Sequence, residues 1–213
     1  MQITILGSTG QVGKAVVNAA LKLGYPVKVL VRDPEKLGQL KEKVEIIKGS
    51  LLDEMSVEKA FEGSEAVINV SGAIKEPEQL QKFQKIGTIL VDKMNQQGIT
   101  RLINISLAVI SLPLEKLDFK RKLLRIPVSL FFKQKKLIQE VVMEIILNGK
   151  NIAWTFVRPA FFSNKAGTGK VLANDKKMPG TTIMLEDLGM FMVEQITSTE
   201  WIRRAPLVAS EIN

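Results

Sequence analysis

Short apolar runs alternate with amphipathic segments along the whole chain. The runs are rich in β-branched residues, which is typical of strands. Behind the first run, Val12, Val16 and Leu23 recur at helical spacing. Gly24 is well placed as the C-cap of that helix. Strands are predicted at residues 2–6, 27–31, 44–48, 65–70, 101–106, 152–157 and 205–209, and the clearest later helices at 78–97 and 129–147.

Strands this continuously apolar are typical of a parallel sheet that helices cover on both faces. Right-handed crossovers between such strands give the doubly wound (Rossmann) α/β fold, with a ligand crevice at the carboxyl ends of the strands. The chain has 213 residues, which suits one core, and it contains no internal repeat or low-complexity segment. We therefore expect one α/β domain over residues 1–213, with a mostly parallel sheet.

The composition narrows the possible chemistry. The sequence has no cysteine and no histidine, so disulfides, thiolate metal sites and Ser-His-Asp triads are excluded. No basic leader opens the sequence, and no apolar run reaches the roughly 18 to 20 residues of a membrane span. We expect a cytoplasmic protein without a transmembrane segment and without a metal site.

Three glycines, Gly7, Gly10 and Gly13, lie between the first strand and the first helix. Side chains at the first two would block a pyrophosphate from the backbone amides, and one at the third would push the helix off the sheet. A turn that merely needs glycines is the alternative, but the position in a βαβ unit favours dinucleotide binding. The predicted phosphate-binding loop consists of Gly7, Ser8, Thr9, Gly10, Gln11, Val12 and Gly13.

The second strand ends in Arg32 and Asp33. Proteins that bind NAD usually place a carboxylate here to accept hydrogen bonds from the ribose, whereas a guanidinium can hold a 2′-phosphate. In the alternative interpretation Arg32 is a solvated charge and Asp33 begins a helix with Pro34 in its first turn. We favour NADP as the cofactor, with NAD as the alternative.

Six segments, in this order, resemble the atypical short-chain dehydrogenase/reductase family. The likeness is to its small NAD(P)H-binding branch, which includes NmrA-like proteins and flavin and biliverdin-IX-beta reductase-like proteins. The segments are "GSTGQVG" (7–13), "VLVRDPEKL" (29–37), "GSLLDEMSVEKAFEGSEAVINVSGA" (49–73), "RLINIS" (101–106), "WTFVRP" (154–159) and "TIMLEDLGMFMVEQI" (182–196).

The resemblance implies roles for residues on the cofactor side. Leu52 and Asp53 would flank the adenine, with the carboxylate near its amino group. Val70, Ser71 and Gly72 would lie along the adenosine ribose and the phosphates. The alternative for Asp53 and Ser71 is that both side chains simply cap turns.

On the substrate side the resemblance implies that Ser106 faces the nicotinamide and that the backbone after Pro159 meets the carboxamide. Phe161 and Phe162 would line the hydride-transfer pocket, with ordinary core or lid packing as the alternative. Lys136, on the long helix, would lie near the nicotinamide ribose.

Most dehydrogenases of the wider superfamily use a tyrosine four residues before a lysine. This chain has one tyrosine, Tyr25, and it lies between the first helix and the second strand. Without that pair the sequence favours a flat aromatic or quinoid acceptor, such as a flavin or quinone, which can take its proton from water. The alternative is a non-catalytic NADP(H)-binding redox sensor or assembly factor.

The net charge of +8 is concentrated in one region, because residues 101–140 carry nine basic and three acidic residues. A cluster of Lys120, Arg121, Lys122 and Arg125 lies in the basic segment 107–139. It predicts a solvated helix leading into a core helix, a rim that attracts acidic substrate groups, or an amphipathic segment that contacts anionic lipid or a protein partner. No helix-turn-helix signature is present, so nucleic-acid binding is not expected, and the oligomeric state is left open.

Overall fold

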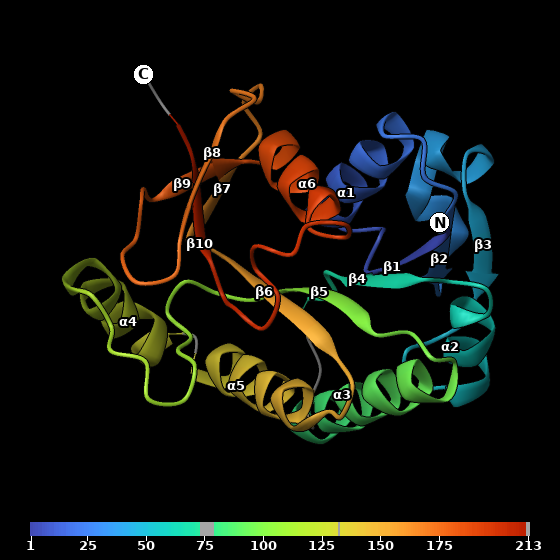
Figure 1. Cartoon of the computed structure of the whole chain (residues 1–213), viewed down its shortest axis with the longest axis horizontal. Helices are drawn as coiled ribbons and strands as arrows, with labels where there is room; N and C mark the ends of the chain where they lie inside the picture. The colour runs from blue at the N-terminus through green and yellow to red at the C-terminus, as the bar shows by residue number, and fades with distance from the viewer. Residues whose placement is uncertain (73–78, 132, 212–213) are drawn as a thin grey trace.

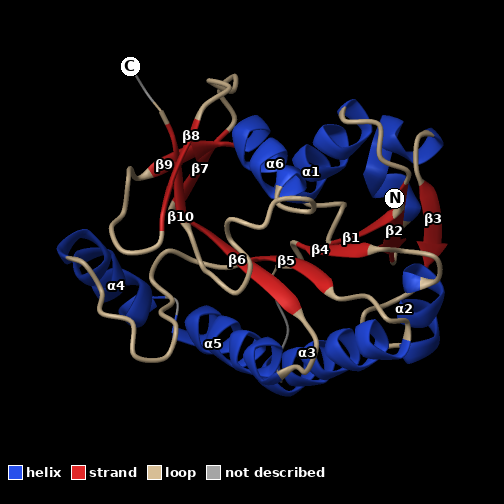
Figure 2. Cartoon of the chain, in the orientation of Figure 1, coloured by secondary structure: helices blue, strands red, loops and turns tan. Residues whose placement is uncertain are grey.

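An eight-stranded sheet runs through the middle of the molecule (Figures 1 and 2). The computed structural model describes residues 1–72, 79–131 and 133–211. The strand order is β3-β2-β1-β4-β5-β6-β10-β8, and β7 and β9 form a separate two-stranded sheet. The strands are β1 (Ile3–Leu6), β2 (Val27–Val31), β3 (Glu45–Lys48), β4 (Ala66–Asn69), β5 (Arg101–Ile105), β6 (Ala153–Pro159), β7 (Phe161–Ser163), β8 (Val171–Asn174), β9 (Thr182–Met184) and β10 (Leu207–Ser210).

The sheet is parallel from β3 to β10, and only its edge strand β8 pairs antiparallel. In the middle, Ile3 of β1 lies opposite Val27 of β2 on one side and Ala66 of β4 on the other. The predicted doubly wound α/β fold is therefore confirmed, and all seven predicted strands are present. The strands β7, β8 and β9 were not predicted, because β7 and β8 are short and partly exposed and β9 has only three residues.

Helices cover both faces of the sheet: α1 and α6 lie on one, and α2, α3 and α5 on the other (Figure 2). The helix predicted at 78–97 is α3, and residue 78 lies outside the described residues. The helix predicted at 129–147 is divided, since α4 ends at Phe131 and α5 begins at Lys133. The helices are α1 (Gln11–Lys22), the 3₁₀ helix η1 (Pro34–Glu42), α2 (Glu54–Phe61), α3 (Gln79–Gln96), α4 (Phe119–Phe131), α5 (Lys133–Asn148) and α6 (Leu185–Glu194).

Two apolar layers form, one on each face of the sheet. Val16 of α1 and Leu188 of α6 pack with Ile5 on one face. On the other face, Ile146 of α5 packs in the same cluster as Leu102 of β5. None of the helices in the described part of the chain combines the length and the apolarity needed to cross a membrane.

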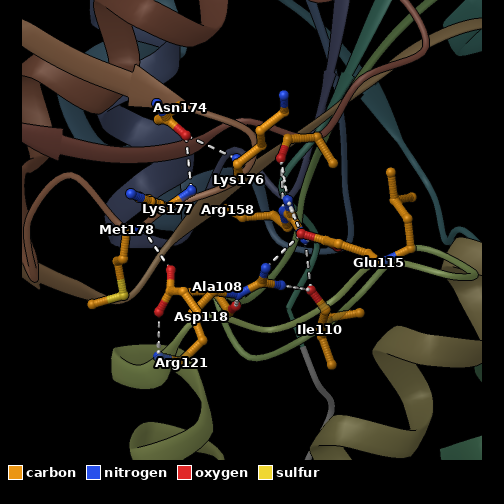
Figure 3. A network of polar contacts seen from close by, with 12 residues as sticks. Ala108, Ile110, Glu115, Asp118, Arg121, Arg158, Asn174, Lys176, Lys177 and Met178 are labelled. Carbon is orange, nitrogen blue, oxygen red and sulfur yellow. Dashed lines mark hydrogen bonds and ion pairs between the residues drawn. The ribbon is translucent and has the colours of Figure 1, made fainter.

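A buried network of two arginines and one glutamate holds the segment after β5 (Figure 3). Glu115 accepts hydrogen bonds from Arg121 of α4 and from Arg158 of β6, with 2.7 Å between Arg158 Nη1 and Glu115 Oε2. The two guanidinium groups also donate hydrogen bonds to the backbone carbonyls of Ala108, Ile110 and Ala205. The network therefore ties the loop after β5 and helix α4 to the middle of the sheet.

Arg121 differs in burial from the other members of the basic cluster predicted from the sequence. Its side chain is fully buried, whereas Lys120 and Lys122 on either side are exposed. Asp118 caps the start of α4, since its Oδ1 accepts a hydrogen bond of 2.9 Å from the Arg121 amide. The other carboxylate oxygen of Asp118 accepts one of 2.7 Å from the Met178 amide. Arg121 is thus a structural anchor rather than a solvated charge.

We expect Glu115→Gln to lower the free energy of unfolding by about 3 kcal/mol or more at neutral pH, because two buried guanidinium groups would lose their counter-ion. Chemical denaturation measures the effect. Glu144→Gln is the control, since Glu144 is exposed on α5. A Glu115 variant as stable as this control would contradict the structural role of the network.

The same network predicts a pH dependence. Burial alone raises the pKa of Glu115, but hydrogen bonds from Arg158 and Arg121 outweigh burial and hold the pKa below its ordinary value. A carboxyl group with a lowered folded-state pKa stabilises the fold above its unfolded-state pKa, and this contribution is lost as the pH falls through the folded-state value. The stability gap between wild type and Glu115→Gln therefore narrows from neutral pH toward about pH 3.

Candidate functional site

A cavity of about 480 Å³ opens where β1, β2, β3 and β4 end. Gly7 follows β1, Arg32 follows β2 and Val70 follows β4, so the cavity lies at the carboxyl edge of the sheet, where doubly wound folds bind ligands. Its lining residues are Gly7, Thr9, Gly10, Gln11, Val12, Gly13, Leu30, Val31, Arg32, Gly49, Ser50, Leu51, Leu52, Val70, Ser71, Gly72, Lys82, Phe83, Ile86 and Phe162.

The three glycines of the loop have different reasons to be glycine. A Cβ on Gly13 would lie 2.1 Å from the Gly7 carbonyl oxygen, so α1 packs directly on the loop backbone as expected. Gly7 has a φ of +82°, and a Cβ there would lie 2.6 Å from the Ser71 amide nitrogen. The fold itself therefore requires glycine at position 7, with or without a ligand. The sequence alone did not reveal this requirement. A Cβ on Gly10 would meet only the Gly7 carbonyl, at an ordinary 3.6 Å.

Ser8 is the one loop residue that does not line the cavity, because its side chain is fully buried. Its hydroxyl has no hydrogen-bond partner within the described residues. Thr9, Gln11 and Val12 do line the cavity. The loop therefore presents backbone and outward side chains to the cavity rather than the Ser8 hydroxyl.

The first turn of α1 is open to an anion. Its N-cap is Gly10, no side chain caps it, and its first turn contains no acidic residue. The first amides of a helix have no intrahelical partner, and the helix dipole places partial positive charge there. Since Gln11, Val12 and Gly13 line the cavity, these donors are at its wall.

The cavity lining carries positive charge. Arg32 and Lys82 line it, and no carboxylate does so among the described residues. Arg32 is exposed and has no ion pair within the described part of the chain. Asp33 instead caps η1, because its Oδ1 accepts a hydrogen bond of 3.2 Å from the Glu35 amide. The alternative that Asp33 begins a helix at Pro34 is thus confirmed, while Arg32 remains available to a ligand.

Two asparagines that the sequence analysis did not single out organise the ends of β4 and β5. Asn69 and Asn104 are paired in the strand register, with 2.7 Å between Asn69 Nδ2 and Asn104 Oδ1. The Asn69 Oδ1 accepts hydrogen bonds from the amide and the hydroxyl of Ser71, at 3.1 and 2.6 Å. Asn104 donates to the Ile105 carbonyl. The signal in the sequence was a polar residue at the matching position of two otherwise apolar strands.

The residues after β3 divide between the cavity and the fold. Leu52 lines the cavity, together with Gly49, Ser50 and Leu51, which were not predicted as site residues. Asp53 is not part of the lining and caps α2, accepting hydrogen bonds from the Ser56 hydroxyl and amide. The hydroxyl bond is the main reason that the pKa of Asp53 is lowered. Turn capping by Asp53 is confirmed, and its contact with an adenine stays a prediction.

Three residues predicted on the nicotinamide side do not line the cavity. Ser106 is 2% exposed, and its hydroxyl has no partner among the described residues. The Pro159 carbonyl accepts a hydrogen bond of 3.1 Å from the Ala108 amide. Lys136 forms an ion pair of 2.8 Å with Glu140 one turn along α5. Their roles toward a cofactor stay predictions.

The two phenylalanines of β7 are exposed rather than buried. Phe161 is 53% and Phe162 45% accessible, so the alternative of core packing is wrong, whereas lid packing stays an open alternative. Phe162 lines the cavity, and Phe161 does not. The cavity therefore has an exposed aromatic ring at its wall.

Comparison with known proteins agrees with this geometry. A family model described as NAD(P)H-binding matches residues 7–199. The chain is 26% identical over 217 residues to (4-alkanoyl-5-oxo-2,5-dihydrofuran-3-yl)methyl phosphate reductase of Streptomyces griseus, covering 97% of this chain and 67% of that protein. It is 34% identical over 106 residues to the isoflavone reductase homolog IRL of Zea mays, covering 46% and 32%. The chain thus spans between about a third and two thirds of the length of these relatives.

Solved structures share the fold at low identity. The oxidoreductase ylbE of Lactococcus lactis superposes with a TM-score of 0.79 at 20% identity, covering 99% of this chain and 91% of that one. ChuY, an anaerobillin reductase of Escherichia coli O157:H7, gives 0.80 at 15% identity, with 100% and 98% covered. These likenesses establish the arrangement of strands and helices.

The glycine loop gives a matched pair of variants. Gly13→Ala is expected to lower the free energy of unfolding by about 2 kcal/mol or more, because its Cβ meets backbone atoms that cannot move aside. Gly10→Ala is expected to change it by less than about 0.5 kcal/mol, while a methyl group at the mouth of α1 weakens pyridine-dinucleotide binding by about tenfold or more.

Thermal unfolding and titration calorimetry separate the two effects. A Gly13→Ala protein as stable as wild type would contradict the packing described for α1. A Gly10→Ala protein that binds dinucleotide as tightly as wild type would contradict phosphate binding at this loop.

Proposed function

Because the chain belongs to the NAD(P)H-binding family, we propose that it is an NADPH-dependent reductase of the atypical short-chain dehydrogenase/reductase type. The observation that carries the proposal is the cavity at the carboxyl edge of the sheet. There the glycine loop, the uncapped start of α1 and Arg32 converge. Backbone donors would hold the diphosphate, and the sheet edge would orient the rest of the dinucleotide.

The choice of NADPH over NADH is supported at the end of β2. Arg32 faces the cavity without an ion pair in the described part of the chain, and Asp33 is engaged at the start of η1. A guanidinium binds a phosphate through forked, charge-assisted hydrogen bonds. The arrangement favours a 2′-phosphate over a bare ribose hydroxyl.

For the acceptor, we propose a flat conjugated molecule such as a flavin or a quinone. NADPH, when bound, supplies a hydride, and an acceptor of this kind takes the accompanying proton from water. The chain would contribute position and charge, which alone account for large rate effects. Exposed Phe162 at the cavity wall offers an apolar ring on which such a molecule could stack.

A second candidate is a non-catalytic NADP(H)-binding sensor or assembly factor. This candidate is favoured because the described cavity lining contains no carboxylate or tyrosine that could serve as a general acid. Ser106 is buried, and Lys136 is paired with Glu140. Such a protein would bind the dinucleotide without turning it over.

Turnover distinguishes the two candidates. We expect the purified protein to oxidise NADPH in the presence of a flavin or quinone from a panel, followed at the nicotinamide absorbance band. Gly10→Ala, which keeps the fold, is expected to lose most of this activity through weaker cofactor binding. Tight NADPH binding without oxidation above the background of protein-free reactions would favour the sensor.

Arg32→Asp tests the cofactor preference. We expect NADPH to bind about 10- to 100-fold more weakly, because the phosphate loses a charged partner and meets a like charge. NADH is expected to change by less than about threefold. Titrations with both nucleotides measure this, and Lys43→Asp, an equal charge change at an exposed position outside the cavity lining, is the control. Equal losses for both nucleotides would contradict a 2′-phosphate contact.

A further inference from the structure

Helix α4 presents a row of large apolar side chains to solvent. Phe119, Leu123, Ile126 and Leu130 follow one another at intervals of four, three and four residues, so they share one face of the helix. They are 79%, 60%, 58% and 72% exposed, respectively. We call these four residues the α4 stripe. Scattered exposed apolar residues are ordinary, but a continuous row indicates an interaction surface.

The opposite face of α4 fixes the direction of the stripe. Arg121 is fully buried and donates to the carbonyls of Ala108 and Ile110 and to Glu115. Asp118 caps the first turn and also accepts from the Met178 amide. The helix is therefore anchored through its inner face (Figure 3). The exposed stripe lies on the opposite face, toward solvent.

Lysines lie around the α4 stripe. With about 3.6 residues per turn, Lys120 and Lys122 fall on opposite sides of the row. Lys116 precedes the helix, Lys133 follows it, and all four lysines are exposed. Within the described residues none of them forms an ion pair with a carboxylate. Glu140 of α5 lies 3.7 Å from Arg125 and 2.8 Å from Lys136, so its negative charge is offset by these two cations.

These features discriminate among possible occupants. A second copy of the chain would bring lysines against lysines, and a nucleic acid would leave four apolar side chains in water. An anionic lipid surface suits both the apolar stripe and the lysines around it. The stripe would enter the boundary of the acyl chains, and the lysines would contact the anionic headgroups. We propose that the α4 stripe docks this protein onto anionic membrane surfaces, with α4 lying in the plane of the interface.

This docking goes beyond the proposed reductase function and does not depend on it. No residue of α4 lines the cavity at the sheet edge. In Figure 1, α4 lies at the end of the molecule opposite β3, and the cavity borders the end of that strand. The nucleotide site therefore stays open while α4 lies on a membrane.

Vesicle sedimentation tests the proposal with the whole 213-residue chain. We expect it to sediment with vesicles of equal parts phosphatidylcholine and phosphatidylglycerol, and at least about tenfold more weakly with pure phosphatidylcholine. Binding should also fall at least about tenfold in 0.5 M NaCl, where surface charges are screened. Leu123→Asn/Ile126→Asn should weaken binding about tenfold or more, and Lys120→Gln/Lys122→Gln should do so through lost charge.

Met55→Asn is the matched control, because Met55 is an equally exposed apolar residue on α2. It should bind vesicles like wild type, and thermal unfolding should show that every variant keeps the fold. The proposal is overturned if wild type does not bind anionic vesicles, or if the Leu123/Ile126 variant binds them as wild type does. It is also overturned if gel filtration shows a dimer that this variant dissociates, since a second copy then covers the stripe.

Discussion

The contact between the backbone of α1 and the backbone of the loop before it is the constraint on which the candidate site depends. At Gly13 the helix lies so close to the backbone of Gly7 that no side chain fits between them. At Gly7 the loop also lies too close to the backbone of Ser71 for a side chain. The ends of β1, β4 and α1 are thereby brought together without intervening side chains. Since backbone contacts leave little room for adjustment, the amides at the start of α1 have a fixed direction toward the cavity. The proposed phosphate binding would depend on this geometry more than on any charged residue.

A second, polar constraint shapes the other side of the molecule. The chain between β5 and α5 is attached to the core by buried apolar residues such as Val109 and Ile110, and the Glu115 network adds a polar attachment. Such a network is costly to bury unless every donor is satisfied, and backbone carbonyls complete it here. One consequence is that α4 is held by its polar inner face. Leu124 packs against the core, whereas Phe119, Leu123, Ile126 and Leu130 lie on the outer face, where a typical surface helix carries polar residues.

The sequence predicted the parts of the fold that depend on local pattern. The seven predicted strands, the first helix, the glycine loop and the position of Arg32 follow from periodicity and turn chemistry. The sequence did not predict β7, β8 and β9, because strands of three or four residues are too short to show a clear pattern. The sequence also did not predict that Arg121 is buried while Lys120 and Lys122 are exposed. The burial of Arg121 depends on tertiary contacts with Glu115, which Arg158 of β6 also contacts. The Asn69–Asn104 pair was likewise a long-range contact that spacing alone could not reveal.

The same distinction explains why the cofactor side is better defined than the acceptor side. The predicted cofactor residues lie at strand ends that the sheet register fixes. The predicted acceptor residues come from separate elements: Ser106 lies behind β5, Lys136 is held by Glu140, and Phe161 and Phe162 protrude from a two-stranded sheet. One exposed aromatic ring, Phe162, lines the cavity, and it would select the proposed acceptor by a flat apolar surface rather than by hydrogen bonds. Because such selection would be tolerant, the acceptor would depend on which conjugated molecules reach the cavity. If α4 docks the protein on a membrane as proposed, acceptor molecules that partition into the membrane would reach the cavity more often than others.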